Sequence, residues 1–259
     1  QGPIFCLSRL TCSLCYARRM SDPATQPQRR YTWSDYQTWD DKKRWEIIGG
    51  EAFLMASPTS RHQHVTGELY AQLLQSLRGK PCKVFISPLD VVLTEEDVLQ
   101  PDVLVVCNPS QIKRTHIEGA PTLCIEVVSA DSGLRDRMRK LALYARSGVK
   151  EYWLVTPWPS MIDVLLLDGQ GYRVQQVFGK EDELRSPTFP DLNLVLRDVF
   201  NFPLEPGEVL QYDEEEAYLA QTYALRPDQI KWRRFKLAEA LGDVDQFNQE
   251  NPLNYEDAW

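Results

Sequence analysis

The pattern of apolar and polar positions becomes regular at Tyr31. Apolar residues at helical spacing predict a short helix over Tyr31–Trp39. The run from Trp45 to Met55 is interrupted by Gly49-Gly50, a two-residue turn signal, and therefore predicts a β-hairpin. After Ser57-Pro-Thr-Ser60, apolar residues recur every four positions from Val65 to about Leu77, which predicts an amphipathic helix.

Runs rich in β-branched residues follow this helix. Lys83–Leu93 and Val98–Cys107 are separated by a short polar segment and predict a second hairpin, and Leu123–Val128 predicts another strand. A helical pattern over 136–146 is stopped by Gly148, and a strand is predicted over 151–155. Later strands are predicted at 161–167, 172–178 and 192–196.

The order helix, strand, strand, strand, helix, strand indicates an α/β protein with a mixed central β-sheet flanked by helices, preceded by the N-terminal hairpin. After Glu205 the chain is acidic and has helical patterns over 214–225 and 227–241. We therefore divide it into an N-terminal extension (1–29), a core domain (30–204) and an acidic helical C-terminal extension (205–259). Within the first of these, we expect residues 1–19 to be an upstream extension and Met20 the natural start.

Composition narrows the classes of function. A net charge of −8 counts against a protein that coats nucleic acid non-specifically, although it allows a local basic groove. No apolar run approaches the ~20 residues needed to cross a bilayer, so no membrane partner is expected. Cys12 and Cys15 lack the second pair that a zinc site needs. We expect Cys107 and Cys124 to be free thiols within strands, in a reduced, cytoplasmic protein.

Two carboxylates stand in apolar strand-like runs. Asp102 heads Val103–Val106, and Glu126 lies between Leu123-Cys-Ile and Val127-Val128. Burying a lone carboxylate costs several kcal/mol unless it is protonated, paired or bound to a metal. Because Mg²⁺ uses one or two carboxylates together with water and phosphate, the pair predicts a hard-cation site.

Asp90 is a possible third carboxylate. If the turn of the second hairpin is centred on Glu96, Asp90 falls opposite Asp102 on the same face of the sheet. A slip of one residue would turn Asp90 to the other face.

The helix after the Glu126 strand carries Asp136, Lys140 and Tyr144 at spacings of four, and therefore on one side. Lys140 can reach back toward the metal and the phosphate under attack. Its alternative role is a surface pair with Asp136, and Tyr144 is favoured as a packing residue.

The same residues carry a resemblance. The sequence resembles the Uma-type family of endonucleases within the PD-(D/E)XK nuclease superfamily. The matching stretches occur in the family's order over roughly 30–200: Tyr31-Thr-Trp-Ser-Asp-Tyr, Trp45-Glu-Ile-Ile-Gly-Gly-Glu51, Ser57-Pro58 with His62-Gln63, Pro88-Leu-Asp-Val-Val-Leu93, Gln100-Pro-Asp-Val103, Glu126-Val-Val-Ser129, the Asp136/Lys140/Tyr144 spacing and Gly148-Val-Lys-Glu-Tyr-Trp153.

The resemblance implies a restriction-endonuclease-like core and a Mg²⁺-dependent endonuclease acting on DNA, with Mn²⁺ as a substitute metal and a homodimer as the expected assembly. Asp102 and Glu126 match the motif's acidic residues. Lys140 matches a lysine moved onto the helix, since Val128 stands where the common motif has Lys. Glu46 matches an upstream acidic position that adds a further metal contact.

Other interpretations remain open at this point. Glu126 can instead form a buried ion pair with Lys140, Arg137 or Arg139, and His62 and His64 are favoured as helix-start or surface residues. The chain can be a catalytically silent nuclease fold used for oligomerisation or protein binding, which its acidic tail favours. Hydrolysis of RNA or of a small nucleotide would use the same site.

Overall fold

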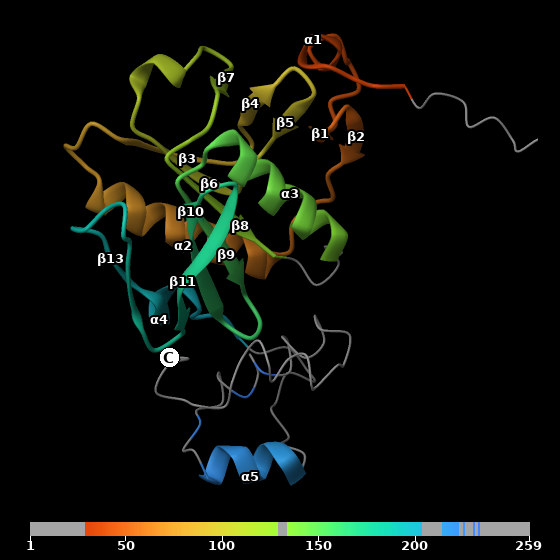
Figure 1. Ribbon diagram of the computed structural model, residues 1–259. Helices are drawn as coiled ribbons and strands as arrows, with labels where there is room; N and C mark the ends of the chain where they lie inside the picture. Colours follow the sequence, from red (N-terminus) through yellow and green to blue (C-terminus); the bar gives the residue numbers. More distant parts are fainter. Residues whose placement is uncertain are drawn as a thin grey trace, which may run out of the picture.

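A computed structural model of the protein (Figure 1) describes residues 29–128 and 134–203, and residues 214–222, 225, 230 and 233 of the tail. Met20 and the Cys12–Cys15 pair lie outside the described residues, as does almost all of the predicted N-terminal extension.

The helices are α1 (Trp33–Tyr36), α2 (Ser60–Ser76), α3 (Leu134–Ser147), α4 (Leu196–Val199) and α5 (Glu214–Thr222), with a 3-10 turn at Pro109–Gln111. The strands are β1 (Trp45–Ile48), β2 (Glu51–Leu54), β3 (Lys83–Ile86), β4 (Asp90–Thr94), β5 (Asp97–Leu99), β6 (Val103–Val106), β7 (His116–Glu118), β8 (Leu123–Val127), β9 (Glu151–Thr156), β10 (Met161–Asp168), β11 (Gly171–Gly179), β12 (Glu183–Arg185) and β13 (Asn193–Val195).

A six-stranded mixed sheet forms the centre, in the order β11-β10-β9-β8-β6-β3. Its β8 and β9 are parallel, whereas β6 and β8 are antiparallel. Successive residues of a strand point to opposite faces. In β8, Leu123, Ile125 and Val127 therefore join the core under α2, while Cys124 packs with α3. The predicted α/β fold, a mixed sheet flanked by helices, is confirmed.

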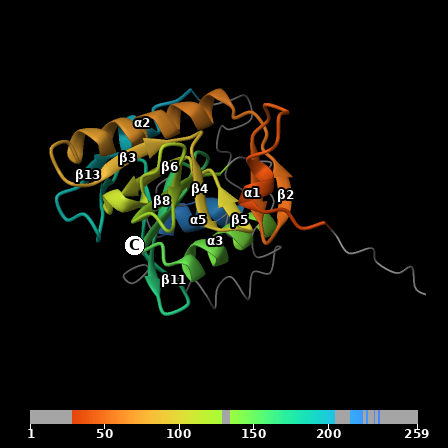
Figure 2. The ribbon, with the colours of Figure 1, turned by 90° about the horizontal axis from the view of Figure 1, so that it is seen from above.

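Helices α2 and α3 cover opposite faces of this sheet (Figure 2). The predicted four-residue repeat of α2 is its buried face, with Leu69 and Leu73 fully covered. At the end of α3, Gly148 adopts a φ of +87°, and its N–H and that of Val149 bond back to Ala145 and Tyr144. This Schellman arrangement is why the helix stops at the predicted glycine.

The second predicted hairpin is present, but each of its arms is divided between two sheets. β3 pairs with β6 in the central sheet, whereas β4 pairs with β5 in a five-stranded sheet of order β2-β1-β5-β4-β7. The predicted N-terminal hairpin, β1–β2, is thus the edge of this second sheet rather than a separate feature. Its turn residues Gly49 and Gly50 have φ of +58° and +79°, as a tight two-residue turn requires.

Cys82 and Cys107 form a disulfide, so the prediction of a free thiol at Cys107 is wrong. The two residues directly continue the β3–β6 pairing beyond Lys83 and Val106. The two cysteines are 25 positions apart in the sequence, and the pairing of β3 with β6 brings them together. Cys124 is a buried free thiol, as predicted.

The C-terminal extension, 205–259, follows Phe200, the last residue of the core clusters. Helix α5 confirms the first predicted tail helix, and Figure 1 shows it apart from the central sheet. Most of the second predicted helix and all of 248–259 lie outside the described residues. Within the part of the chain that is described, no helix is both long and apolar enough to cross a membrane.

Candidate metal-binding and catalytic site

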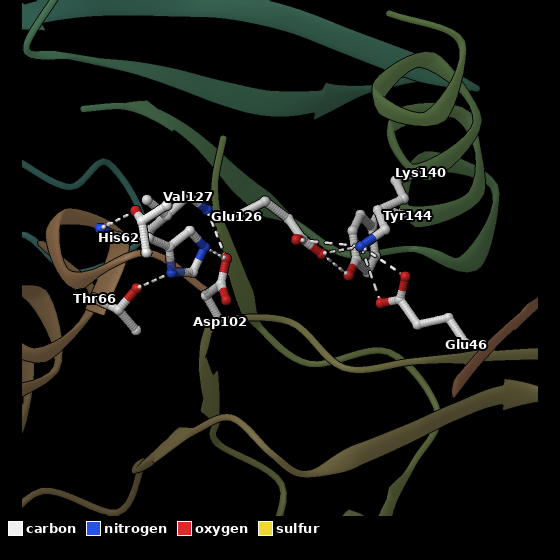
Figure 3. Close-up of polar contacts among 9 residues, drawn as sticks. Glu46, His62, Thr66, Asp102, Glu126, Val127, Lys140 and Tyr144 are labelled. Carbon is white, nitrogen blue, oxygen red and sulfur yellow. Dashed lines mark hydrogen bonds and ion pairs between the residues drawn. The ribbon is translucent and has the colours of Figure 1, made fainter. Parts of the chain in front are cut away.

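Asp102 and Glu126 are neighbours across two antiparallel strands. β6 and β8 pair with Val103 opposite Ile125, and one further step of this register puts Asp102 opposite Glu126. Such residues have Cβ atoms about 4.5–5.5 Å apart. Figure 3 shows that the two carboxyl groups then turn to different partners, Asp102 toward His62 and Glu126 toward α3.

Asp102 is held by the backbone and by a histidine. Its Oδ2 accepts the N–H of Val127 at 2.8 Å and lies 3.3 Å from Nε2 of His62. The first turn of α2 fixes His62, because the hydroxyl of the N-cap residue Thr59 accepts its N–H. Burial disfavours the charged imidazole, but the hydrogen bond and the charge of Asp102 outweigh it and raise the pKa of His62.

Glu126 is buried against α3. The Tyr144 hydroxyl donates a 2.6 Å hydrogen bond to its Oε1, and Nζ of Lys140 lies 3.4 Å from its Oε2. Burial raises the pKa of Glu126 from 4.5 to about 7, opposed by the charge of Lys140, while the charges of Asp102 and Glu46 raise it further. The carboxyl group therefore stands where added positive charge would be favourable.

Lys140 is a buried cation between two carboxylates. Its Nζ lies 2.9 Å from both Oε atoms of Glu46, on β1, in addition to its contact with Glu126. The side chain of Lys140 is only 11% exposed, so its role is not that of an ordinary surface helix pair. Arg139 instead faces outward and pairs with Glu51, which removes it as the partner of Glu126. The side chains of Asp136 and Arg137 lie outside the described part of the molecule.

Asp90 does not lie opposite Asp102, and this prediction is wrong. The β4–β5 register pairs Val91 with Leu99, which puts Asp90 opposite Gln100. The pairing of Val91 with Leu99 is centred on residue 95 instead of Glu96, so the partner of Asp90 shifts by two residues, and a bulge follows Val92. Gln100 Nε2 donates to Asp90 at 2.8 Å, and Gln100 N–H donates to Glu46 at 3.0 Å. Asp90 is thus linked to the site through Gln100.

Three contributions to the site were not assigned from the sequence. His62 contacts Asp102 instead of taking a surface role, and Tyr144 combines packing with a hydrogen bond to Glu126. Gln100 connects two carboxylates. The four-residue spacing of Lys140 and Tyr144 was the one sequence signal for Tyr144, whereas nothing in the local pattern distinguishes His62 from a helix-start residue.

The donor set suits a hard cation. Asp102 and Glu126 offer carboxylate oxygens on adjacent strands, and Glu126 is buried near the charges of Asp102 and Glu46 as well as that of Lys140. No three His, Cys, Asp or Glu side chains among the described residues are gathered as ready ligands of one ion. Mg²⁺ needs no such cage, since it keeps several waters and binds through one or two carboxylates. The residues therefore fit the metal that the resemblance implies.

Comparison with known proteins identifies the family and the fold. The family model Uma2, described as "Putative restriction endonuclease", matches residues 33–197. The uncharacterized protein slr1290 of Synechocystis sp. (strain PCC 6803) is 28% identical over 134 residues, covering 50% of this chain and 70% of the relative. A crystal structure from Anabaena variabilis, described as a putative nuclease belonging to DUF820, shares the fold with a TM-score of 0.55 at 20% identity, covering 65% of this chain and 97% of that one. Because the family model spans well over half of the sequence, this chain belongs to the Uma2 family of restriction-endonuclease-like proteins.

Proposed function

We propose that the protein is a metal-dependent endonuclease that hydrolyses phosphodiester bonds in DNA, with Mg²⁺ as its metal and Mn²⁺ as a substitute. The observation that carries this proposal is the arrangement of Asp102 and Glu126 on adjacent strands, with the buried cation of Lys140 beside them. Membership of the Uma2 family supports the same class of reaction.

Asp102 and Glu126 would hold the metal. When bound, Mg²⁺ polarises a phosphoryl oxygen and eases the deprotonation of water. His62 and the Val127 N–H both contact Oδ2 of Asp102, which fixes the orientation of that carboxylate. Tyr144 orients Glu126 in the same way from α3.

Lys140 supplies positive charge where the phosphate is attacked. Its Nζ already faces Glu126 and Glu46, so it is held in place before substrate arrives. A preorganised cation can orient the attacking water or offset the charge that builds on the phosphorane. Glu46 positions Lys140, because it contacts the ammonium group with both oxygens.

The proposal is tested by incubating supercoiled plasmid and single-stranded circular DNA with Mg²⁺, with Mn²⁺ or with EDTA. Asp102→Asn is the matched variant, because an asparagine oxygen can still accept the Val127 N–H while the charge is lost. We expect cleavage by the wild type with metal only, and a loss of ~10²-fold or more in Asp102→Asn. Equal cleavage by both proteins would remove Asp102 from the site. Cleavage of RNA and not of DNA would mean that the substrate is RNA.

A silent scaffold is the second candidate, and one observation favours it. Glu46 and Glu126 already share the ammonium group of Lys140 as an ion-pair partner. Absence of cleavage with every metal and substrate, together with unchanged folding, would support it. The homodimer and the cytoplasmic location stay predictions. The Cys82–Cys107 disulfide counts against the reduced state on which that location was based.

A further inference from the structure

A cavity of about 200 Å³ lies close to the candidate site, at the end of β9. Among the residues of its lining that the structure describes, two are cationic, three are aromatic and none is acidic. They are Arg61, Val65, Pro157, Trp158, Ser160, Lys180, Phe200 and Phe202. In a chain with a net charge of −8, a hollow with this lining is suited to an anion that also has a flat apolar part.

The cavity lies at the same end of the central sheet as the carboxylates, but on the α2 side, where Val65 and Phe200 belong to the core cluster, whereas Glu126 turns to α3. Arg61 directly precedes His62 in α2, and the parallel β8–β9 register puts Leu154 beside Glu126. Pro157 follows Leu154 by three residues, which is roughly 10 Å at about 3.3 Å per residue. Asp102 is contacted by His62 of α2 and so connects the two sides, and an extended polymer that passes over this end of the sheet can reach both the cavity and Asp102.

Arg61 is fixed on one wall of the cavity. Its Nη2 donates to the carbonyl oxygen of Pro203 at 3.0 Å, and its guanidinium lies 5.4 Å from the ring centre of Phe202. Lys180 joins the lining from the end of β11. A cation held in this way loses little side-chain freedom when it binds an anion, which favours recognition of phosphate.

We propose that this cavity binds one unpaired nucleotide of the strand that is cut, with its phosphate at Arg61 and Lys180 and its base against Trp158. Phosphates pair with Arg and Lys, and bases stack on aromatic side chains. A base inside a duplex is already stacked and cannot enter a pocket unless it leaves the helix. This inference rests on the proposed function and narrows its substrate class to strands with an unpaired nucleotide near the scissile bond.

The test measures binding without chemistry. A short fluorescein-labelled single strand, and the same strand in a duplex, are titrated with protein in EDTA and followed by fluorescence anisotropy over a range of salt concentrations. The variants are Lys180→Glu, Trp158→Leu and the control Arg78→Glu. Arg78 is exposed just past the far end of α2, about 25 Å from Arg61. The substitution Arg78→Glu therefore makes the same change in charge as Lys180→Glu, but far from the cavity.

We expect the single strand to bind more tightly than the duplex. Lys180→Glu should weaken its binding about ten-fold and make the salt dependence shallower by about 0.7 in logarithmic slope, as for one lost phosphate contact on a single strand. Trp158→Leu should weaken it about ten-fold with an unchanged slope, as for lost stacking. Arg78→Glu should match the wild type. Lys180→Ala replaces Lys180→Glu if circular dichroism shows that the latter is unfolded.

The inference is overturned if Lys180→Glu and Arg78→Glu bind alike, if the duplex binds as well as the strand, or if free dAMP binds in the cavity and the strand does not. Its failure is separate from failure of the proposed function. A wild type that binds the strand through the cavity but cuts nothing contradicts only the nuclease proposal. A Lys180→Glu variant that binds and cuts as the wild type does contradicts only the cavity.

Discussion

Replacing Lys140 by Met removes the one cation that the structure places between Glu46 and Glu126 in the described part of the site. Met is close to Lys in length and unbranched, so the packing against α3 is largely kept and the loss of charge is the main change. The variant therefore measures how much the buried ammonium group contributes to folding as well as to activity.

The expected loss of stability is large because all three partners are buried. Nζ lies 2.9 Å from Glu46 and 3.4 Å from Glu126, and the three side chains are 11%, 6% and 13% exposed. Removing one partner of a buried ion pair leaves an uncompensated charge and costs ~3–5 kcal/mol. For a domain of this size, that corresponds to a fall in Tm of ~6–20 °C.

The assay is urea unfolding at neutral pH, followed by circular dichroism, for the wild type, Lys140→Met, Glu46→Gln and the double variant. Glu46→Gln keeps an oxygen that can accept the Gln100 N–H, which Glu46 accepts at 3.0 Å. The double variant removes the uncompensated carboxylate, so it should recover ~1–3 kcal/mol relative to Lys140→Met. Both proteins that lack Lys140 should still lose ~10²-fold in DNA cleavage.

Lys140 contributes no more than an exposed ion pair if the free energy of unfolding of Lys140→Met lies within about 0.5 kcal/mol of the wild-type value. If the double variant is no more stable than Lys140→Met, Glu46 is not the carboxylate that Lys140→Met leaves without a partner. A double variant that regains both stability and cleavage would make Lys140 a structural residue only.

Three further predictions follow from the same contacts. Tyr144→Phe should lower the free energy of unfolding by about 1.5–3 kcal/mol in urea, because Glu126 loses a hydrogen bond; no change would mean that water replaces it. Cys82→Ser should cost about 3.5 kcal/mol, from the loop of 25 residues that the disulfide closes, and dithiothreitol should lower the Tm of the wild type but not of this variant. Truncation after Pro206 should leave a folded core with an unchanged circular dichroism spectrum, because the core clusters end at Phe200; an unfolded product would make the tail part of the core.

The sequence predicted those features that depend on neighbouring residues. The four-residue repeat of α2, the turn at Gly49-Gly50 and the stop at Gly148 each arise from local backbone geometry, and the structure confirms them. Asp102 and Glu126 could be identified as unusual because a carboxylate within an apolar strand has a high energetic cost wherever the strand packs. The spacing of the following helix offered Lys140 as a residue able to reach them, and the family resemblance then assigned Lys140 to the site and added Glu46.

The tertiary structure decided which side chains meet. The chain crosses from one sheet to the other between β5 and β6, and a bulge in β4 shifts the pairing, so Asp90 meets Gln100 rather than Asp102. The partner of Glu126 is Lys140 and not Arg139, because the rotation of α3 turns adjacent residues to different sides. His62 reaches Asp102 only because α2 begins at the end of the strands. Sequence periodicity fixes which face of an element is buried, but long-range pairing depends on bulges and strand crossings, where a shift of one residue redirects every side chain that follows.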